Sequence, residues 1–200
     1  RGESVVKLGA VYPQIELSGA PEAVHAIGVA VEDMGLKHLV MYDHVLGAVH
    51  ADRDPPLFGP YTERDPFHDP FVAFGYLAGI TKTIDFITGV LILPQRQTVL
   101  VAKQATDVDL FSNGRLILGV GIGWNYVEYD GLGYDFKTRG KRMDEQIPFL
   151  RRLWSEDVID WKGQFDRVDG ANLIPKPKRQ IPIYCGGLGE PAYRRAAKMG

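Results

Sequence analysis

The chain alternates short apolar runs with segments of helical periodicity, and this alternation restricts its fold more than any other feature. The apolar runs lie at 5–12, 38–42, 84–93, 116–120 and 181–185. Strands that are apolar on both faces are typical of a parallel sheet covered by helices, so we predict an α/β fold. Two architectures fit five such units: a doubly wound open sheet, or a (β/α)8 barrel of which only part is present.

The segments between these runs begin and end as helices should. Val24, Ile27 and Val31 share one helical face, and Gly35 stands where a C-terminal cap is expected. Asp69 and Pro70 predict the cap and first residue of another helix. We therefore predict helices that start near Pro21, Pro70, Thr98 and Pro191, and one marked by Met143, Ile147, Leu150 and Trp154.

Two segments depart from the alternation without dividing the chain, which we interpret as a single domain over 1–200. Residues 43–68 form a long proline-rich stretch, and loops of that length are usually functional. Residues 157–170 resemble an inserted hairpin that turns near Lys162 and Gly163. Residues 125–138 lack a helical pattern, and we expect a polar and aromatic loop there.

Charge and composition exclude several classes of function. A net charge of −2 gives no general attraction to nucleic acid or to anionic membranes. The single cysteine, Cys185, excludes an internal disulfide and a thiolate zinc cluster, and we expect no metal site. No apolar run reaches the roughly 18 residues of a membrane span, and residues 1–7 do not resemble a signal peptide. We expect a cytoplasmic protein with a small-molecule substrate.

Ligands of parallel α/β folds bind beyond the carboxyl ends of the strands, and that rule selects the candidate site residues. They are Tyr12 and Gln14, Asp43 and His44, Arg96, then Gly121, Gly123, Trp124 and Asn125, and finally Gly186 and Gly187. His44 is the acid–base candidate because histidine titrates near neutral pH, and the plainer alternative is that it hydrogen-bonds to loop backbone and caps its strand. Arg96 could bind a phosphate or pair with an acid such as Asp107.

The glycines after the fourth run argue against a nicotinamide enzyme. Gly119, Gly121 and Gly123 alternate, so they do not form the GxGxxG dinucleotide fingerprint. Glycine lets a flat ring or a phosphate approach the main chain closely, and Gly186 and Gly187 precede a predicted helix N-terminus. Tight turns in short loops explain the same glycines equally well.

Several motifs in order carry a resemblance to a known family. They are TGVLILPQR at 88–96, the run KQATDVDLFSNGRLILGVGIGWN at 103–125, RGKRMD at 139–144 and PIYCGG at 182–187. Together they resemble the luciferase-like monooxygenase superfamily, and most closely its branch of probable coenzyme F-420-dependent oxidoreductases. The resemblance extends over nearly the whole chain and implies a (β/α)8 TIM barrel with its cofactor at the C-terminal mouth.

The resemblance also implies roles for individual residues. His44 would face the deazaflavin ring and move a proton, with Asp43 orienting it. A non-prolyl cis peptide between Gly89 and Val90 would support the back of the ring. Gly121, Gly123, Trp124, Asn125, Gly186 and Gly187 would contact the cofactor. Tyr12, Gln14 and Arg96 would lie near the substrate, and the family often forms homodimers.

Two departures from the family pattern leave the activity open. Sugar-phosphate dehydrogenases of the superfamily carry a glutamate where this chain has Trp124, so that activity is not carried over. The barrel also needs three more strand–helix units beyond the roughly five present, so we expect a longer protein, or else a partner chain that closes the barrel. An FMN-dependent monooxygenase and a non-catalytic flavin- or deazaflavin-binding paralogue remain alternatives.

Overall fold

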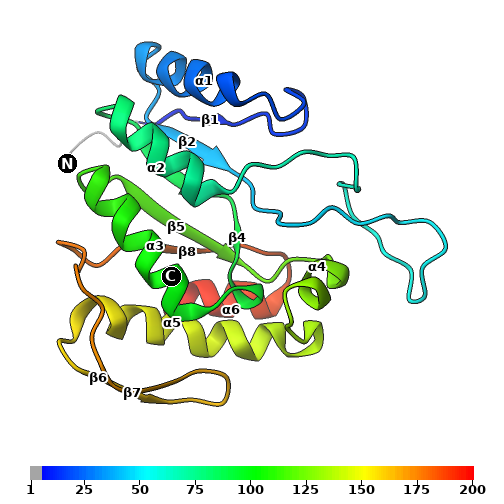
Figure 1. Cartoon of the computed structure of the whole chain (residues 1–200), viewed down its shortest axis with the longest axis vertical. Helices are drawn as coiled ribbons and strands as arrows, with labels where there is room; N and C mark the ends of the chain where they lie inside the picture. Colours follow the sequence, from blue (N-terminus) through cyan, green and yellow to red (C-terminus); the bar gives the residue numbers. More distant parts are fainter. Residues whose placement is uncertain (1–5) are drawn as a thin grey trace.

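The order of the strands decides between the two architectures. The computed structural model describes residues 6–200, so Val5 and the rest of the first five residues lie outside it. Strands β1 (Ala10–Val11), β2 (His38–Met41), β3 (Asp85–Thr88), β5 (Leu116–Gly121) and β8 (Ile183–Cys185) each pair in parallel with the next in chain order (Figure 1). A doubly wound sheet reverses its order part-way, whereas barrel strands follow one another. The sheet is therefore part of a (β/α)8 barrel.

Helices of the repeating units cover one face of this sheet (Figure 1). They are α1 (Pro21–Asp33), α2 (Pro70–Ile80), α3 (Thr98–Phe111), α5 (Arg139–Ser155) and α6 (Glu190–Met199). The Asp69 carboxylate accepts hydrogen bonds from the amides of Phe71 and Val72, which confirms the predicted cap. None of the helices within residues 6–200 is long and apolar enough to cross a bilayer.

The core lies between the sheet and these helices. Leu39, Phe86 and Leu118 from successive strands are completely buried. The ring of Phe74 in α2 stacks on Phe86 with 5.0 Å between centroids. The strands are thereby fixed from the helical side, and their carboxyl ends stay in register at one rim.

The third apolar run, predicted as one strand over 84–93, is interrupted. It comprises β3, a cis peptide between Gly89 and Val90, β4 (Leu91–Ile92) and a 3-10 turn, η1 (Leu93–Gln95). The cis bond confirms what the family resemblance implied. Strand β4 pairs with β5 further along, with Leu91 opposite Val120.

The loop predicted after the fourth strand is partly helical, so that prediction is corrected. It contains α4 (Tyr126–Gly131) and the 3-10 turn η2 (Phe136–Thr138). The Asn125 side chain begins α4 by accepting hydrogen bonds from the amides of Val127 and Glu128. A helix of six residues is too short to display a hydrophobic period, which is why pattern analysis missed it.

The inserted segment near 157–170 is an antiparallel hairpin of β6 (Ile159–Lys162) and β7 (Arg167–Ala171). Trp161 stacks on Phe149 of α5 with 4.7 Å between ring centroids. Glu145 of α5 accepts hydrogen bonds from the turn amides of Gln164, Phe165 and Asp166 at 2.7, 3.0 and 2.9 Å. Residues 43–68 contain neither helix nor strand.

We predict that Glu145→Ala loosens this hairpin. Burial acts to raise the pKa of Glu145, but the three turn amides outweigh it and the pKa is lowered. The carboxylate therefore stabilises the fold above the ordinary glutamate pKa of about 4.3, and the contribution is lost as the pH falls through the lowered value. Denaturant unfolding at neutral pH should show a loss of about 1–2 kcal/mol, since the turn is partly exposed.

The matched control is Asp157→Ala, which removes an exposed carboxylate at the start of the same hairpin. We expect little change in its unfolding free energy. If Glu145→Ala and Asp157→Ala unfold alike at neutral pH and at low pH, the carboxylate does not anchor the turn.

Candidate active site

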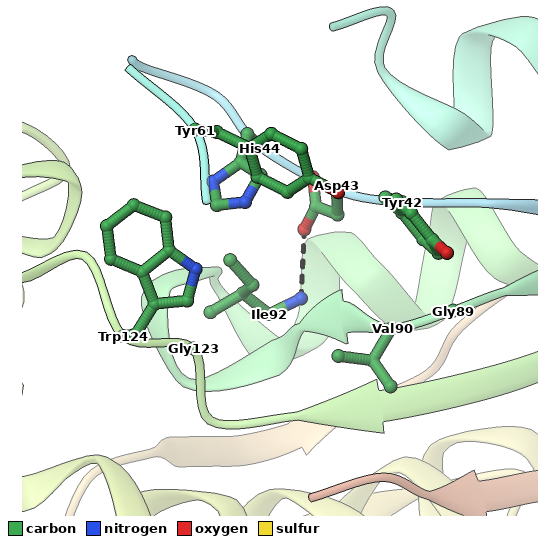
Figure 2. A pocket seen from close by; sticks show the side chains of 9 residues that line it. All are labelled: Tyr42, Asp43, His44, Tyr61, Gly89, Val90, Ile92, Gly123 and Trp124. Carbon is green, nitrogen blue, oxygen red and sulfur yellow. Dashed lines mark hydrogen bonds between the residues drawn. The ribbon is translucent and has the colours of Figure 1, made fainter. Parts of the chain in front are cut away.

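A cavity of about 290 Å³ lies at the carboxyl ends of β2, β4 and β5 (Figure 2). Its lining residues are Tyr42, Asp43, His44, Tyr61, Gly89, Val90, Ile92, Gly123 and Trp124. The second strand supplies one wall, the interrupted third strand supplies the base, and the turn after β5 supplies the opposite wall. The rim holds the only titratable ring nitrogen among these residues, that of His44.

His44 is enclosed by aromatic rings. Its centroid lies 4.8 Å from that of Phe67, 5.3 Å from Tyr61 and 5.6 Å from Trp124. The side chain is only 9% exposed, and Nδ1 lies 3.3 Å from Oε2 of Glu128. The imidazole is therefore held by packing on its faces and by a carboxylate at one nitrogen.

Glu128 is completely buried in α4 and binds the start of the long loop as well as His44. Its Oε1 accepts hydrogen bonds from the amides of Val45 and Leu46. The side-chain amide of Asn125 donates a hydrogen bond to the carbonyl of Leu46 at 3.1 Å. The short helix α4 thus fixes the main chain directly after His44.

Asp43 does not orient His44, contrary to our expectation. Its carboxylate accepts two hydrogen bonds from Arg96, of 2.6 and 3.2 Å, and one from the amide of Ile92 at 2.9 Å. Burial raises the pKa of Asp43, although the Arg96 guanidinium acts in the opposite direction. The Asp43–Arg96 pair joins β2 to η1 and is part of the scaffold of the site.

Arg96 pairs with acids, which was one of the two alternatives predicted for it, but Asp107 is not one of them. Arg96 binds Asp43 and, at 3.0 Å, Asp69 at the N-terminus of α2. Asp107 instead lies 3.5 Å from Lys103 on its own helix. With its guanidinium engaged by two carboxylates, Arg96 has little capacity for a phosphate.

The alternating glycines make room for the interrupted third strand. A Cβ at Gly121 would overlap Cγ2 of Val90, and one at Gly186 would lie 2.5 Å from Cγ1 of the same side chain. A Cβ at Gly119 would overlap the carbonyl of Thr88, whose hydroxyl donates to the Gly119 carbonyl at 2.7 Å. Gly121 and Gly186 therefore make room for the side chain of Val90, which lines the cavity, and Gly119 makes room for Thr88.

The structure brings six of the sequence-selected residues together in the cavity. These are Asp43, His44, Gly89, Val90, Gly123 and Trp124. Tyr12, Gln14, Arg96, Gly121, Asn125, Gly186 and Gly187 are outside its lining. Gln14 is buried, donating to the carbonyl of Tyr42 at 3.0 Å and accepting from the amide of His68 at 3.1 Å.

Sequence reasoning missed Glu128, Tyr42, Tyr61 and Ile92. The signal for Glu128 was its place three residues after Asn125, which is the spacing of a helix capping box. In such a box the acid turns back to the cap residue, whereas here it reaches His44, 84 residues away in sequence. Only the folded chain reveals that contact.

The long loop contacts the segment after β5 and contributes Tyr61 to the lining of the cavity. Gly59 lies against the ring of Trp124, where any Cβ would overlap it. The Tyr126 hydroxyl donates to the carbonyl of Pro55 at 2.6 Å, and His50 Nε2 lies 2.9 Å from the carbonyl of Tyr61. The loop between Gly47 and Pro66 is therefore seated on Trp124 and α4.

Residues 6–200 match the sequence profile of the luciferase-like monooxygenase family. The chain belongs to this family. The match covers all of the chain that the structure describes, and it agrees with the barrel order of the strands and with the interrupted third strand.

Luciferase-like relatives include proteins named for different cofactors. An uncharacterized protein of Mycobacterium tuberculosis is 33% identical over 84% of this chain and 60% of its own length. The FMNH(2)-dependent dimethylsulfone monooxygenase of Pseudomonas fluorescens is 33% identical over 66% of this chain and 37% of its own length. The F420-dependent glucose-6-phosphate dehydrogenase of Amycolatopsis mediterranei is 28% identical over 90% and 52%.

A solved structure shows the same fold over a longer chain. It is an F420-dependent secondary alcohol dehydrogenase in complex with an F420–acetone adduct, similar with a TM-score of 0.76 at 21% identity. The likeness covers 98% of this chain and 57% of that one. The chain spans 37–60% of the length of the three relatives named above.

We predict that Gly121→Ala alters the base of the cavity. The added methyl overlaps Val90, which is stiff because it branches at Cβ and is confined by Gly186. Overpacking of this kind costs about 1–3 kcal/mol of unfolding free energy and displaces Val90. Denaturant unfolding should show the loss, and flavin or deazaflavin binding should weaken.

Gly75→Ala provides the matched control for this change. Gly75 lies in α2, and a Cβ there would meet no atom within 4 Å. It should leave binding unchanged and stabilise the helix by up to about 1 kcal/mol. Equal behaviour of the two variants would mean that Val90 yields freely and that Gly121 is not needed for space.

Proposed function

We propose that the whole protein is an oxidoreductase that transfers hydride between a deazaflavin, coenzyme F-420, and a small organic substrate. The observation that carries the proposal is the position of His44. His44 follows the end of β2, lines the cavity beside Gly89 and Val90 of the interrupted third strand, and is shielded by three aromatic rings. Such a group can move one proton in a site from which water is largely excluded.

The residues present fit the ring of such a cofactor. The base offers main chain and small side chains at Gly89, Val90 and Gly123, and the walls are the flat rings of Tyr61 and Trp124 (Figure 2). A volume of about 290 Å³ is close to the lower limit of ligand cavities, roughly 300–1,000 Å³, which suits a ring rather than a whole cofactor. We propose that Gly186 and Gly187, ahead of α6, lie toward the phosphate end.

When bound, a deazaflavin supplies or accepts the hydride. The protein's own contribution is to hold the ring and substrate together, to exclude water and to manage the accompanying proton. His44 would accept the hydroxyl proton of an alcohol as it is oxidised, or return a proton to a carbonyl as it is reduced. The Asp43–Arg96 pair would hold β2 and the interrupted third strand in place and would take no part in proton or hydride transfer.

The nature of the cofactor is the first prediction of this proposal. Titration of the whole protein with F-420 and, separately, with FMN should show tight binding of F-420 and weak binding of FMN. Relatives of both kinds are similar to this chain, the F420-dependent one at 28% identity over 90% of it and the FMNH(2)-dependent one at 33% over 66%, so the titration decides between the two cofactors. Tight FMN binding with oxygen-dependent turnover would instead establish an FMN-dependent monooxygenase.

We further predict that His44→Ala lowers the turnover of F-420 with secondary alcohols, ketones or enones by about 10²–10⁴-fold, the usual contribution of an acid–base group. Binding of F-420 should change much less. His25→Ala is the matched control, because His25 lies on α1 and contacts Tyr76 far from the cavity lining. Full turnover by His44→Ala would remove His44 from the mechanism.

A further inference from the structure

Glu128 is a buried carboxylate without an arginine or lysine partner among residues 6–200. Its side chain is completely inaccessible, and its only ionic contact there is His44. Burying a carboxylate in this way is costly unless donors surround it. The donors are the amides of Val45 and Leu46 at Oε1 and the Nδ1 of His44 at Oε2.

We infer that Glu128 is the positioning residue of His44 and selects the tautomer that the reaction needs. The inference rests on the proposed role of His44. A carboxylate can only accept hydrogen bonds, so the nitrogen facing it must carry the proton. The neutral ring then has its proton on Nδ1 and a free lone pair on Nε2.

The remaining contacts of the ring agree with this assignment. No hydrogen bond from residues 6–200 reaches Nε2, and that atom is not sealed from solvent, while the ring lines the cavity. Nε2 is thus the nitrogen available to a ligand. With the opposite tautomer, Nε2 would begin with a proton and could not accept one from a substrate hydroxyl.

Neighbouring titratable groups do not substitute for Glu128. Asp43, which also follows β2, accepts hydrogen bonds from Arg96 and from the Ile92 amide with its carboxylate oxygens. Tyr61, from the long loop, packs against the imidazole in a T-shaped arrangement, and burial raises the pKa of its hydroxyl. His50 packs against Trp124 with 5.9 Å between ring centroids, and its Nε2 lies 2.9 Å from the Tyr61 carbonyl.

The same carboxylate links the imidazole to the loop that covers it. Oε1 fixes the first two amides after His44, and Oε2 fixes the ring itself. Any movement of the loop start relative to α4 therefore also moves His44. Correct seating of the loop and the correct tautomer of His44 depend on one group.

Glu128→Gln separates tautomer selection from simple structural support. The glutamine carbonyl can still accept from the loop amides, while its NH2 group points at Nδ1 and requires an acceptor there. The ring is then driven to carry its proton on Nε2. Asp130→Asn, on the exposed side of the same helix, is the matched control for loss of one negative charge.

Nitrogen-15 NMR of the histidine rings, in protein free of cofactor, tests the inference directly. His44→Ala identifies the His44 signals by their loss. At a pH where the ring is neutral, we expect the wild type and Asp130→Asn to carry the proton on Nδ1, and Glu128→Gln to carry it on Nε2. A wild-type ring protonated on Nε2 overturns the inference, even if Glu128→Gln fails to fold.

Turnover distinguishes this inference from the proposed function. With F-420 and secondary alcohols, ketones or enones, Glu128→Gln should lower kcat by about 10²-fold or more with little change in KM. If His44→Ala is impaired and Glu128→Gln is not, the positioning role is wrong and the function stands. If both variants match the wild type, the proposed function of His44 has failed.

Discussion

The close approach of the interrupted third strand to the main chain of β5 is the constraint on which the site depends. Val90 can occupy the space between β5 and β8 only because Gly121 and Gly186 carry no side chain, and Thr88 can bind the Gly119 carbonyl only because Gly119 carries none. The interruption turns Val90 and Ile92 toward the same rim as His44. The glycines that the sequence suggested as a phosphate-binding loop are required for the packing of Thr88 and Val90.

Two buried carboxylates complete the geometry in different ways. Asp43 is matched by Arg96 and locks β2 to the turn after β4, whereas Glu128 has no strong cation among the described residues and is held by amides and His44. A bidentate pair suits a structural joint because its two hydrogen bonds fix the relative position of the two segments. A carboxylate whose only ionic partner is an imidazole suits a residue that gains and loses a proton during a reaction.

Much of this fold could be predicted from the sequence, and less of the site. The strands could be predicted because each apolar run is short and is bounded by proline or glycine, as Pro94 and Gly114 illustrate. The choice of barrel over open sheet needed strand order, which no local pattern contains. The partners of Arg96 and Glu128 could not be predicted because they lie 27 to 84 residues away and are fixed by tertiary packing. Helix α4 was missed because it is too short for periodicity.

The position of Trp124 links these points to specificity. Where the resemblance places a glutamate in sugar-phosphate dehydrogenases, this chain has an indole that contacts His44, lines the cavity and seats Gly59 of the long loop. The acid nearest to His44 is found four residues later, behind the imidazole, where it cannot touch a substrate. The wall opposite Tyr61 is thus aromatic, and the polar side-chain atoms of the cavity lining that are not paired with Arg96 belong to His44, Tyr42, Tyr61 and Trp124. Under the proposed function, a substrate that meets the Trp124 wall would present an apolar or flat surface to it and would direct its reacting oxygen at Nε2 of His44.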